Sequence, residues 1–95
     1  MTYKLTRPAI RHMNAISDYT LNTWGIIKEE QYMRQLQACM SQLGTNSMLG
    51  TPRDDVRPGL RSFPCGRHKI YFRQAPHGVN ISGVLHQSQD PKKYL

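Results

Sequence analysis

Residues 57–73 read Arg-Pro-Gly-Leu-Arg-Ser-Phe-Pro-Cys-Gly-Arg-His-Lys-Ile-Tyr-Phe-Arg, and this run predicts a β-hairpin. Short apolar and aromatic runs lie on both sides of a Gly-Arg pair at 66–67, which suits a tight turn. We therefore expect one strand over residues 60–65 and a second over residues 68–73. A third strand is expected over residues 79–86, after a turn that contains proline and glycine.

The two-residue period of a strand separates the side chains of this hairpin into two faces. One face is expected to cover the core and to hold His68 as a part-buried, hydrogen-bonded residue. The core face is assigned Ile70 and Phe72 and, from the third strand, Val79, Ile81 and Leu85. The opposite face carries basic and aromatic groups and is expected to face water or a partner. It is assigned Lys69, Tyr71 and Arg73, with His86 at the end of the third strand beside them.

Two helices are predicted between a short strand over residues 3–6 and the hairpin. The first begins after Thr6, a suitable N-cap, and ends at Gly25. Its apolar stripe predicts a core face made of Ala9, Met13, Ile16, Thr20 and Trp24, with Tyr19 beside it. The second begins near Ile27, ends at Gly44 and repeats Tyr32, Leu36, Cys39 and Leu43 on one face. The short connection predicts that the two helices pack as an antiparallel hairpin.

Together these elements predict a single α+β domain over residues 1–95, in the order β-α-α-β-β-β. The helical hairpin is expected to pack on an antiparallel sheet. Residues 45–59 lack periodicity and are predicted to form a loop. Residues 87–95 are polar and are expected to be loosely ordered.

The charge of the chain points to an acidic partner. Its 13 Lys and Arg side chains exceed its 6 Asp and Glu side chains and give a net charge of +7, which attracts polyanions and acidic protein segments. Residues 53–73 hold six of the basic and two of the acidic side chains, so the charge is concentrated around the hairpin. The candidate partner contacts are Arg57, Arg61, Arg67, Lys69, Tyr71 and Arg73. The same residues could instead form a solvated face, because charged edges also keep sheets from pairing.

Several classes of protein are excluded by what the sequence lacks. No apolar run is long enough to span or enter a membrane, so we expect a cytoplasmic protein without a membrane partner. Cys39 and Cys65 fall in different predicted elements, and we expect packed thiols rather than a disulfide or a metal pair. Neither metal-ligand spacing nor a nucleotide-binding or hydrolase motif is present, so no cofactor and no metal site is expected.

A resemblance to a known family is carried by segments along nearly the whole chain. These are Ala9 with Met13 and Ile16, Tyr19-Thr20, Trp24-Gly25, Tyr32, Leu36, Leu43, residues 57–64, Gly66-Arg67-His68, residues 70–73, Val84-Leu85-His86 and Asp90. The chain thereby resembles the ParE toxins of bacterial type II toxin–antitoxin pairs, and residues 57–73 are the most specific part of the match.

The resemblance implies the RelE/ParE fold and a cognate ParD-like antitoxin, whose disordered part folds as it wraps the toxin in a hetero-oligomer. ParE-like toxins typically bind DNA gyrase and stall it on cleaved DNA. The resemblance therefore implies a toxin that acts by binding, without catalysis of its own and without direct sequence-specific binding to nucleic acid.

A second function is compatible with the same fold. RelE-like ribonucleases cut messenger RNA on the ribosome with basic, tyrosine or histidine side chains on the sheet. Here the candidates are Arg61, Lys69, Tyr71, Arg73 and His86, which could clamp phosphate and transfer protons during attack by a 2′-hydroxyl. The sequence of residues 57–68 follows the ParE pattern and favours the gyrase-binding hypothesis.

Overall fold

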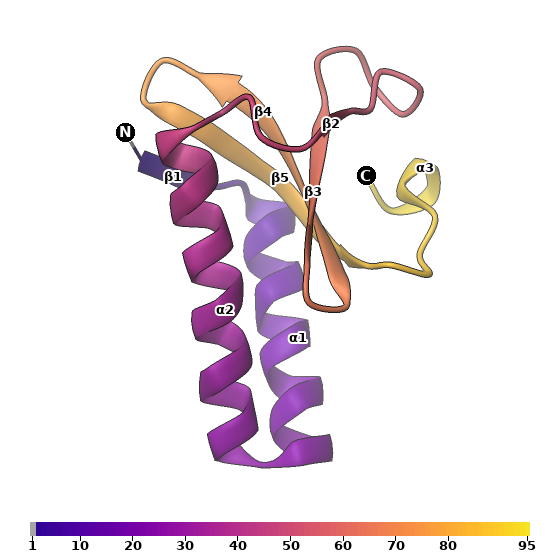
Figure 1. Cartoon of the computed structure of the whole chain (residues 1–95). Coiled ribbons are helices and arrows are strands. Elements are labelled where there is room, and N and C mark those ends of the chain that lie inside the picture. The colour runs from indigo at the N-terminus through magenta and orange to yellow at the C-terminus, as the bar shows by residue number, and fades with distance from the viewer. Residues whose placement is uncertain (1) are drawn as a thin grey trace.

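The computed structural model describes residues 2–95 and contains a five-stranded sheet with two long helices and a short C-terminal one (Figure 1). The elements are β1 (Thr2–Leu5), α1 (Arg7–Trp24), α2 (Ile26–Thr45), β2 (Thr51–Pro52), β3 (Arg61–Cys65), β4 (His68–Ala75), β5 (Gly78–His86) and α3 (Pro91–Tyr94). The predicted α+β class and element order are confirmed, and β2 and α3 are additional short elements. Among the described residues, no helix has the length and apolar character needed to cross a bilayer.

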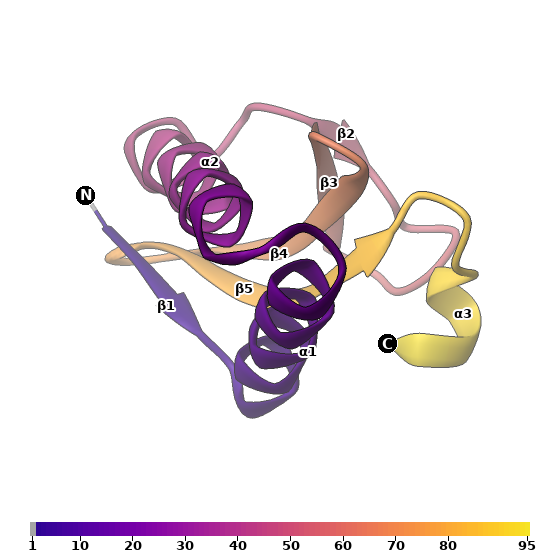
Figure 2. The same ribbon diagram turned by 90° about the horizontal axis from the view of Figure 1, so that it is seen from below.

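The helical hairpin packs on one face of the sheet, and its connecting end projects beyond the sheet (Figures 1 and 2). Thr6 caps α1 as predicted, because its side-chain oxygen accepts a hydrogen bond from the Ala9 amide at 3.3 Å. The core between helices and sheet is formed by Ala9, Met13, Ile16, Leu36, Met40, Leu43, Cys65, Ile70, Phe72, Val79, Ile81 and Val84. The predicted stripe of α1 is therefore buried as far as Thr20.

The sheet has the strand order β1-β5-β4-β3-β2, and β3, β4 and β5 pair antiparallel as predicted. The first strand differs from the prediction, because β1 pairs parallel to β5, with Thr2 opposite Gly78. Gly44 was predicted to end α2, but the helix continues to Thr45. Its lack of a side chain serves packing instead, because a Cβ at Gly44 would lie 2.8 Å from the backbone of Thr2.

A β-bulge in the sheet corrects the predicted assignment of side chains to faces. Tyr71 pairs with Gly83 while Phe72 pairs with Ile81, so Ser82 is an extra residue in β5. Beyond this residue the alternation of β5 is reversed. As a result His86 lies on the helix side of the sheet opposite His68, and Leu85 lies on the other face.

The face of the sheet away from the helices is covered. Leu60, Tyr71 and Leu85 are buried there, with Val56 and Leu95 packed against them. The cover consists of the loop after β2 and the C-terminal turn α3, which lie side by side (Figure 1). The prediction that Tyr71 faces water or a partner is therefore wrong. Residues 87–95, predicted to be loosely ordered, end on Leu95, which packs on this face.

The tail makes contacts that its polar composition did not predict. Asp90 caps α3, since its carboxylate accepts a hydrogen bond from the Lys92 amide at 2.9 Å. The carbonyl oxygen of Leu95 accepts a hydrogen bond from the guanidinium of Arg57. A capped helical turn followed by one apolar anchor residue, Leu95, thus completes the cover that the loop after β2 begins.

Candidate functional site

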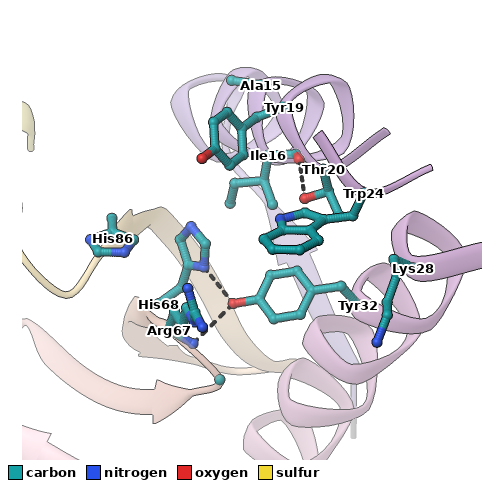
Figure 3. A pocket seen from close by; sticks show the side chains of 11 residues that line it. Ala15, Ile16, Tyr19, Thr20, Trp24, Lys28, Tyr32, Arg67, His68 and His86 are labelled. Atoms are coloured by element: carbon teal, nitrogen blue, oxygen red, sulfur yellow. Dashed lines mark hydrogen bonds between the residues drawn. The ribbon is translucent and has the colours of Figure 1, made fainter. Parts of the chain in front are cut away.

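A cavity of about 700 Å³ opens between the projecting part of the helical hairpin and the turn that joins β3 to β4 (Figure 3). We call it the aromatic groove. It is lined by Ala15, Ile16, Tyr19, Thr20 and Trp24 of α1, Lys28 and Tyr32 of α2, Gly66 and Arg67 of the turn, His68 of β4 and His86 of β5.

The aromatic walls of the groove are open to water. Tyr19 is 67% exposed and Trp24 is 61% exposed, although the helical stripe predicted that both belong to the core. The prediction is wrong because α1 is longer than the sheet is wide. An 18-residue helix spans roughly 27 Å, so its last turns pass the edge of the sheet and find no strand to pack against. Ile26 and Ile27 at the start of α2 are exposed as well.

A hydrogen-bonded pair, Tyr32 and His68, forms one end of the groove (Figure 3). The Tyr32 hydroxyl oxygen accepts a hydrogen bond from the Arg67 amide at 3.1 Å and lies 2.5 Å from Nδ1 of His68. The hydroxyl carries one proton and two acceptor lone pairs, so the direction of this hydrogen bond depends on which ring nitrogen of His68 is protonated. Burial raises the pKa of Tyr32, so the hydroxyl keeps this proton at neutral pH.

The prediction that His68 is a part-buried, hydrogen-bonded histidine is confirmed. Burial, assisted by the neighbouring His86, lowers the pKa of His68 to about 4. The ring is therefore neutral at physiological pH. Its partner across the strands, His86, stacks edge-on at a centroid distance of 5.5 Å, and Nδ1 of His86 lies 2.7 Å from the Ser88 hydroxyl.

The groove combines apolar walls with a cationic rim. Lys28 and Arg67 are exposed at its margin, and His68 inside it is a neutral, hydrogen-bonded ring. Such a surface suits an apolar or aromatic side chain whose neighbours are acidic. Within residues 2–95, no group of three or more His, Cys, Asp or Glu side chains is placed to hold a metal ion.

The six residues predicted from the sequence as partner contacts do not lie together. Arg67 lines the aromatic groove, whereas Arg61 points to the edge between β3 and the preceding loop. There it donates hydrogen bonds to the carbonyl oxygens of Met48 at 2.8 Å and Gly50 at 3.2 Å. Arg61 thus holds a loop in place.

The other four candidates belong to the covered side of the molecule. Arg73 donates to the carbonyl oxygen of Pro58 at 2.5 Å, and Arg57 donates to that of Leu95. Tyr71 is 2% exposed, with the Arg53 guanidinium 5.9 Å from its ring centre. Lys69 lies on this face and is half-buried. Arg57, Arg61 and Arg73 therefore hold backbone segments in place by donating hydrogen bonds to carbonyl oxygens.

Sequence reasoning missed the main residues of the groove, namely Tyr19, Trp24, Lys28 and Tyr32. One signal could have found them. The two strands predicted for the hairpin are six residues long, or roughly 20 Å, which is shorter than an 18-residue helix. The apolar stripe of a helix that extends past the sheet must end on residues that no strand covers, and these residues are exposed.

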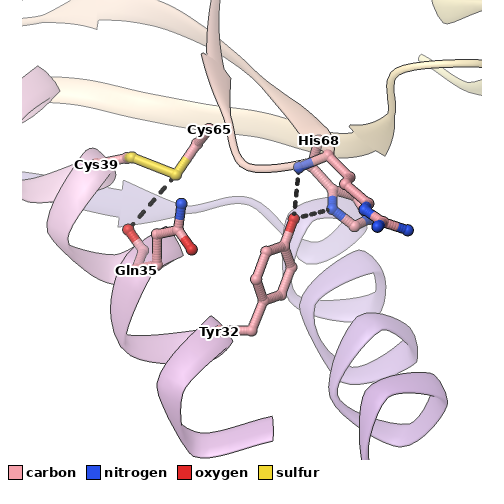
Figure 4. Close-up of a disulfide and its surroundings, with 6 residues drawn as sticks. Tyr32, Gln35, Cys39, Cys65 and His68 are labelled. Atoms are coloured by element: carbon pink, nitrogen blue, oxygen red, sulfur yellow. Dashed lines mark hydrogen bonds between the residues drawn. A yellow bond between two sulfur atoms is a disulfide. The ribbon is translucent and has the colours of Figure 1, made fainter. Parts of the chain in front are cut away.

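Cys39 of α2 and Cys65 of β3 are joined in a disulfide, with Cα atoms 6.5 Å apart (Figure 4). The prediction that Cys39 and Cys65 are packed, unpaired thiols is therefore wrong. The pairing follows from the packing of α2 on β3, which brings together residues 26 positions apart and has no local signature. The disulfide lies next to the Tyr32–His68 pair, because Cys65 directly precedes Gly66 (Figure 4).

Comparisons with known proteins agree with this geometry. The sequence model of the family described as ParE toxin of type II toxin-antitoxin system, parDE, matches residues 3–91. Toxin ParE1 of Mycobacterium tuberculosis (strain H37Rv) is 34% identical over 94 residues, covering 98% of this chain and 96% of that protein. Toxin ParE1 of Caulobacter vibrioides is 31% identical over 93 residues, with the same coverage of 98% and 96%.

A solved structure shares the fold. A chain of the chromosomal ParDE TA system from P. aeruginosa superimposes with a TM-score of 0.77 at 22% sequence identity. The match covers 90% of this chain and 95% of that chain, so the two-helix hairpin on a sheet is common to both.

Proposed function

The chain belongs to the ParE toxins of type II toxin–antitoxin systems, and from this premise we propose that a ParD-like antitoxin neutralises it by binding the aromatic groove. We propose further that the free toxin binds DNA gyrase in the bacterial cytoplasm and inhibits it without catalysing a reaction. The exposed aromatic walls of the groove are the observation that carries the first proposal.

The groove has the features of a protein-binding site. Exposed aromatic side chains are the residues that most often dominate binding energy at protein interfaces, and Tyr19 and Trp24 of α1 both line this cavity. Ile26 and Ile27, at the connection between the two helices, are exposed as well. Several exposed apolar side chains at one end of the molecule are typical of an interaction site.

The chemistry of the partner follows from charge. The chain carries a net charge of +7, and Lys28 and Arg67 lie at the rim of the groove. An acidic amphipathic segment could place an apolar side chain between the aromatic walls and a carboxylate on either cation. This is the chemistry expected of a disordered antitoxin segment that folds as it binds.

The ribonuclease hypothesis loses support from the positions of its residues. Tyr71 is buried in an apolar cluster, and the guanidinium of Arg73 is occupied by a backbone carbonyl. His86 lies on the helix side of the sheet, whereas Lys69 and Tyr71 lie on the other face. A general acid and a phosphate clamp must reach the same scissile bond, and these side chains do not converge. The arrangement therefore favours inhibition by binding.

Expression of the chain alone in a bacterial host tests the proposed target. We expect filamentous cells, induction of the DNA damage response and, with purified gyrase, accumulation of cleaved DNA. If, as we expect, an acidic antitoxin is encoded beside the gene, its co-expression should restore growth. Immediate arrest of translation with cleaved transcripts, together with normal gyrase activity in vitro, would contradict the gyrase proposal and favour the ribonuclease.

A further inference from the structure

We propose that Cys39 and Cys65 form a reversible thiol–disulfide clasp that holds one wall of the aromatic groove and makes partner binding depend on redox state. The inference rests on the proposed function, because it assumes that the groove is where the antitoxin binds. These are the two cysteines of the chain, and they are joined across the boundary between α2 and the β3–β4 turn.

The position of the clasp connects it to the groove. Cys39 follows Tyr32 by seven residues, or about two helical turns, so both residues lie on the same side of α2. Cys65 is the last residue of β3 and pairs with His68 across the hairpin. One cross-link therefore fixes the distance between the helix that carries Tyr32 and the turn that carries Arg67 (Figure 4).

Few other contacts fix this distance. The packing of α2 on β3 is sparse compared with the pairing within the sheet. Besides the disulfide, the turn is held to α2 by the two hydrogen bonds of the Tyr32 hydroxyl, to His68 and to the Arg67 amide. The hydrogen bond to His68 is part-buried and the one from the Arg67 amide is exposed, so both are open to competition from water. With the sulfurs unlinked, the turn can move away from α2 and the groove loses its fixed shape.

The reaction is an ordinary thiol–disulfide exchange. A low-molecular-weight disulfide of the glutathione type accepts two electrons and two protons from the two cysteine thiols and becomes two thiols. The first step forms a mixed disulfide on Cys39, because Cys39 is half-buried while Cys65 is 4% exposed. The Cys65 thiolate then displaces the small thiol and closes the protein disulfide. An excess of the small thiol reverses both steps.

The oxidised protein is expected to bind its partner more tightly. A groove that is already in its binding shape avoids the loss of conformational freedom that a mobile turn would suffer on binding. The reducing conditions of a cytoplasm would keep the clasp open, and oxidative conditions would close it. The stability of the toxin–antitoxin complex would thus rise with oxidation.

Trypsin digestion of the full chain tests the clasp without any partner. Oxidised protein is compared with protein that has been reduced and then freed of reductant under nitrogen. We expect cleavage after Arg67 to become about tenfold faster on reduction, because the turn opens locally. Cleavage after Lys93, on the far side of the sheet, is the internal control and should not change. Equal rates of cleavage after Arg67 in both states would overturn the proposal.

Incubation in a series of glutathione buffers, followed by counting of free thiols, tests reversibility. The pair should convert between dithiol and disulfide within the range of a cellular thiol pool. A pair that stays oxidised or stays reduced in every buffer would contradict the switch. The Cys39→Ser variant, which keeps the fold contacts but cannot form the clasp, should digest like the reduced protein in all buffers.

Calorimetric titration with the acidic protein encoded beside the gene then tests the coupling. We expect its Kd to be about tenfold lower for the oxidised chain, in line with the expected difference in local opening. Equal Kd values in both states would overturn the coupling. Absence of binding in both states would instead overturn the proposed antitoxin site, and the digestion result would still decide whether the clasp controls the turn.

Discussion

The two faces of the sheet differ in what covers them. On the helix side, the projecting hairpin leaves a groove with exposed Tyr19 and Trp24 and with His68 at its end. On the other side, a loop and the C-terminal turn bury Tyr71 and Leu85. The segment richest in basic residues, 53–73, contributes mainly to the covered face. The aromatic surface on the other side is the one that is available to a partner.

The difference separates stability from binding. Side chains on the covered face are held by apolar contacts and backbone carbonyls, so changing them should alter the free energy of unfolding. The exposed side chains of the groove, Tyr19 and Trp24, contribute little to the core, so changing them should alter affinity for a partner. A groove variant that lowers stability, or a covered-face variant that lowers only affinity, would contradict this division.

The largest effect on stability is expected from Tyr71→Ala. Removing a buried aromatic ring should lower the free energy of unfolding by about 3 to 5 kcal/mol. The matched variant Tyr19→Ala removes the same side chain from an exposed position and should change it by less than about 0.5 kcal/mol. Urea unfolding followed by circular dichroism measures both, and similar losses for the two variants would refute the assignment of open and covered faces.

Reduction of the Cys39–Cys65 disulfide should also destabilise the fold. Opening a loop of this length should lower the free energy of unfolding by about 3.5 kcal/mol through the entropy of the unfolded chain. The melting temperature should fall by roughly 15 to 25 °C. Thermal melting of oxidised and reduced protein measures the shift. Identical melting curves would show that the cross-link does not constrain the unfolded chain.

Gly66→Ala should perturb the groove with a smaller loss of stability. Gly66 has φ of +60°, and a Cβ there would lie 2.7 Å from the Tyr32 ring, so the ring must move. We expect a loss of about 2 kcal/mol, of which about 1 kcal/mol is backbone strain. In a Tyr32→Ala background the contact is absent, and the same substitution should cost only the strain. An equal cost in both backgrounds would mean that the turn is not packed against Tyr32.

The smallest effect is expected from pH. The pKa of His68 is about 4 in the folded protein and near 6.5 in the unfolded chain, so below pH 6.5 the unfolded state binds more protons. Stability should therefore be full above pH 6.5 and fall as the pH drops toward 4. Because His68 is part-exposed, solvent screening reduces the expected loss to about 1 kcal/mol.

The matched variant for this pH effect is His68→Gln, which should reduce the slope of stability against pH. Burial, with a contribution from Arg11, also lowers the pKa of His12, whose Nδ1 accepts a hydrogen bond from the Val84 amide at 3.1 Å. Some slope should therefore remain in the variant. Urea titrations at pH 7 and pH 5 measure it, and an unchanged slope would exclude His68 as its source.

Local patterns predicted most of the fold. The hairpin turn at residues 66–67, the cap at Thr6 and the core stripe from Ala9 to Thr20 depend on neighbours in sequence, and all three are confirmed. The hydrogen-bonded state of His68 was also predicted, because its strand period placed it with Ile70.

The remaining features depend on contacts between distant residues. The extra residue Ser82 shifts the faces of β5, and nothing in its local composition marks a bulge. The exposure of Trp24 depends on where the sheet ends relative to α1. The Cys39–Cys65 pair and the docked Leu95 depend on tertiary packing across the molecule. Periodicity reports which side chains share a face only where the strand or helix is regular, and it does not report what covers that face.

The affinity of two alanine variants for the acidic protein encoded beside the gene tests the central claim most directly. Trp24→Ala removes a wall of the groove, and Lys69→Ala removes a cation from the opposite face. With both variants folded, we predict that Trp24→Ala raises Kd about 30-fold or more, as expected for an aromatic hot spot, while Lys69→Ala leaves it within about threefold. Loss of affinity in Lys69→Ala with unchanged affinity in Trp24→Ala would contradict the account.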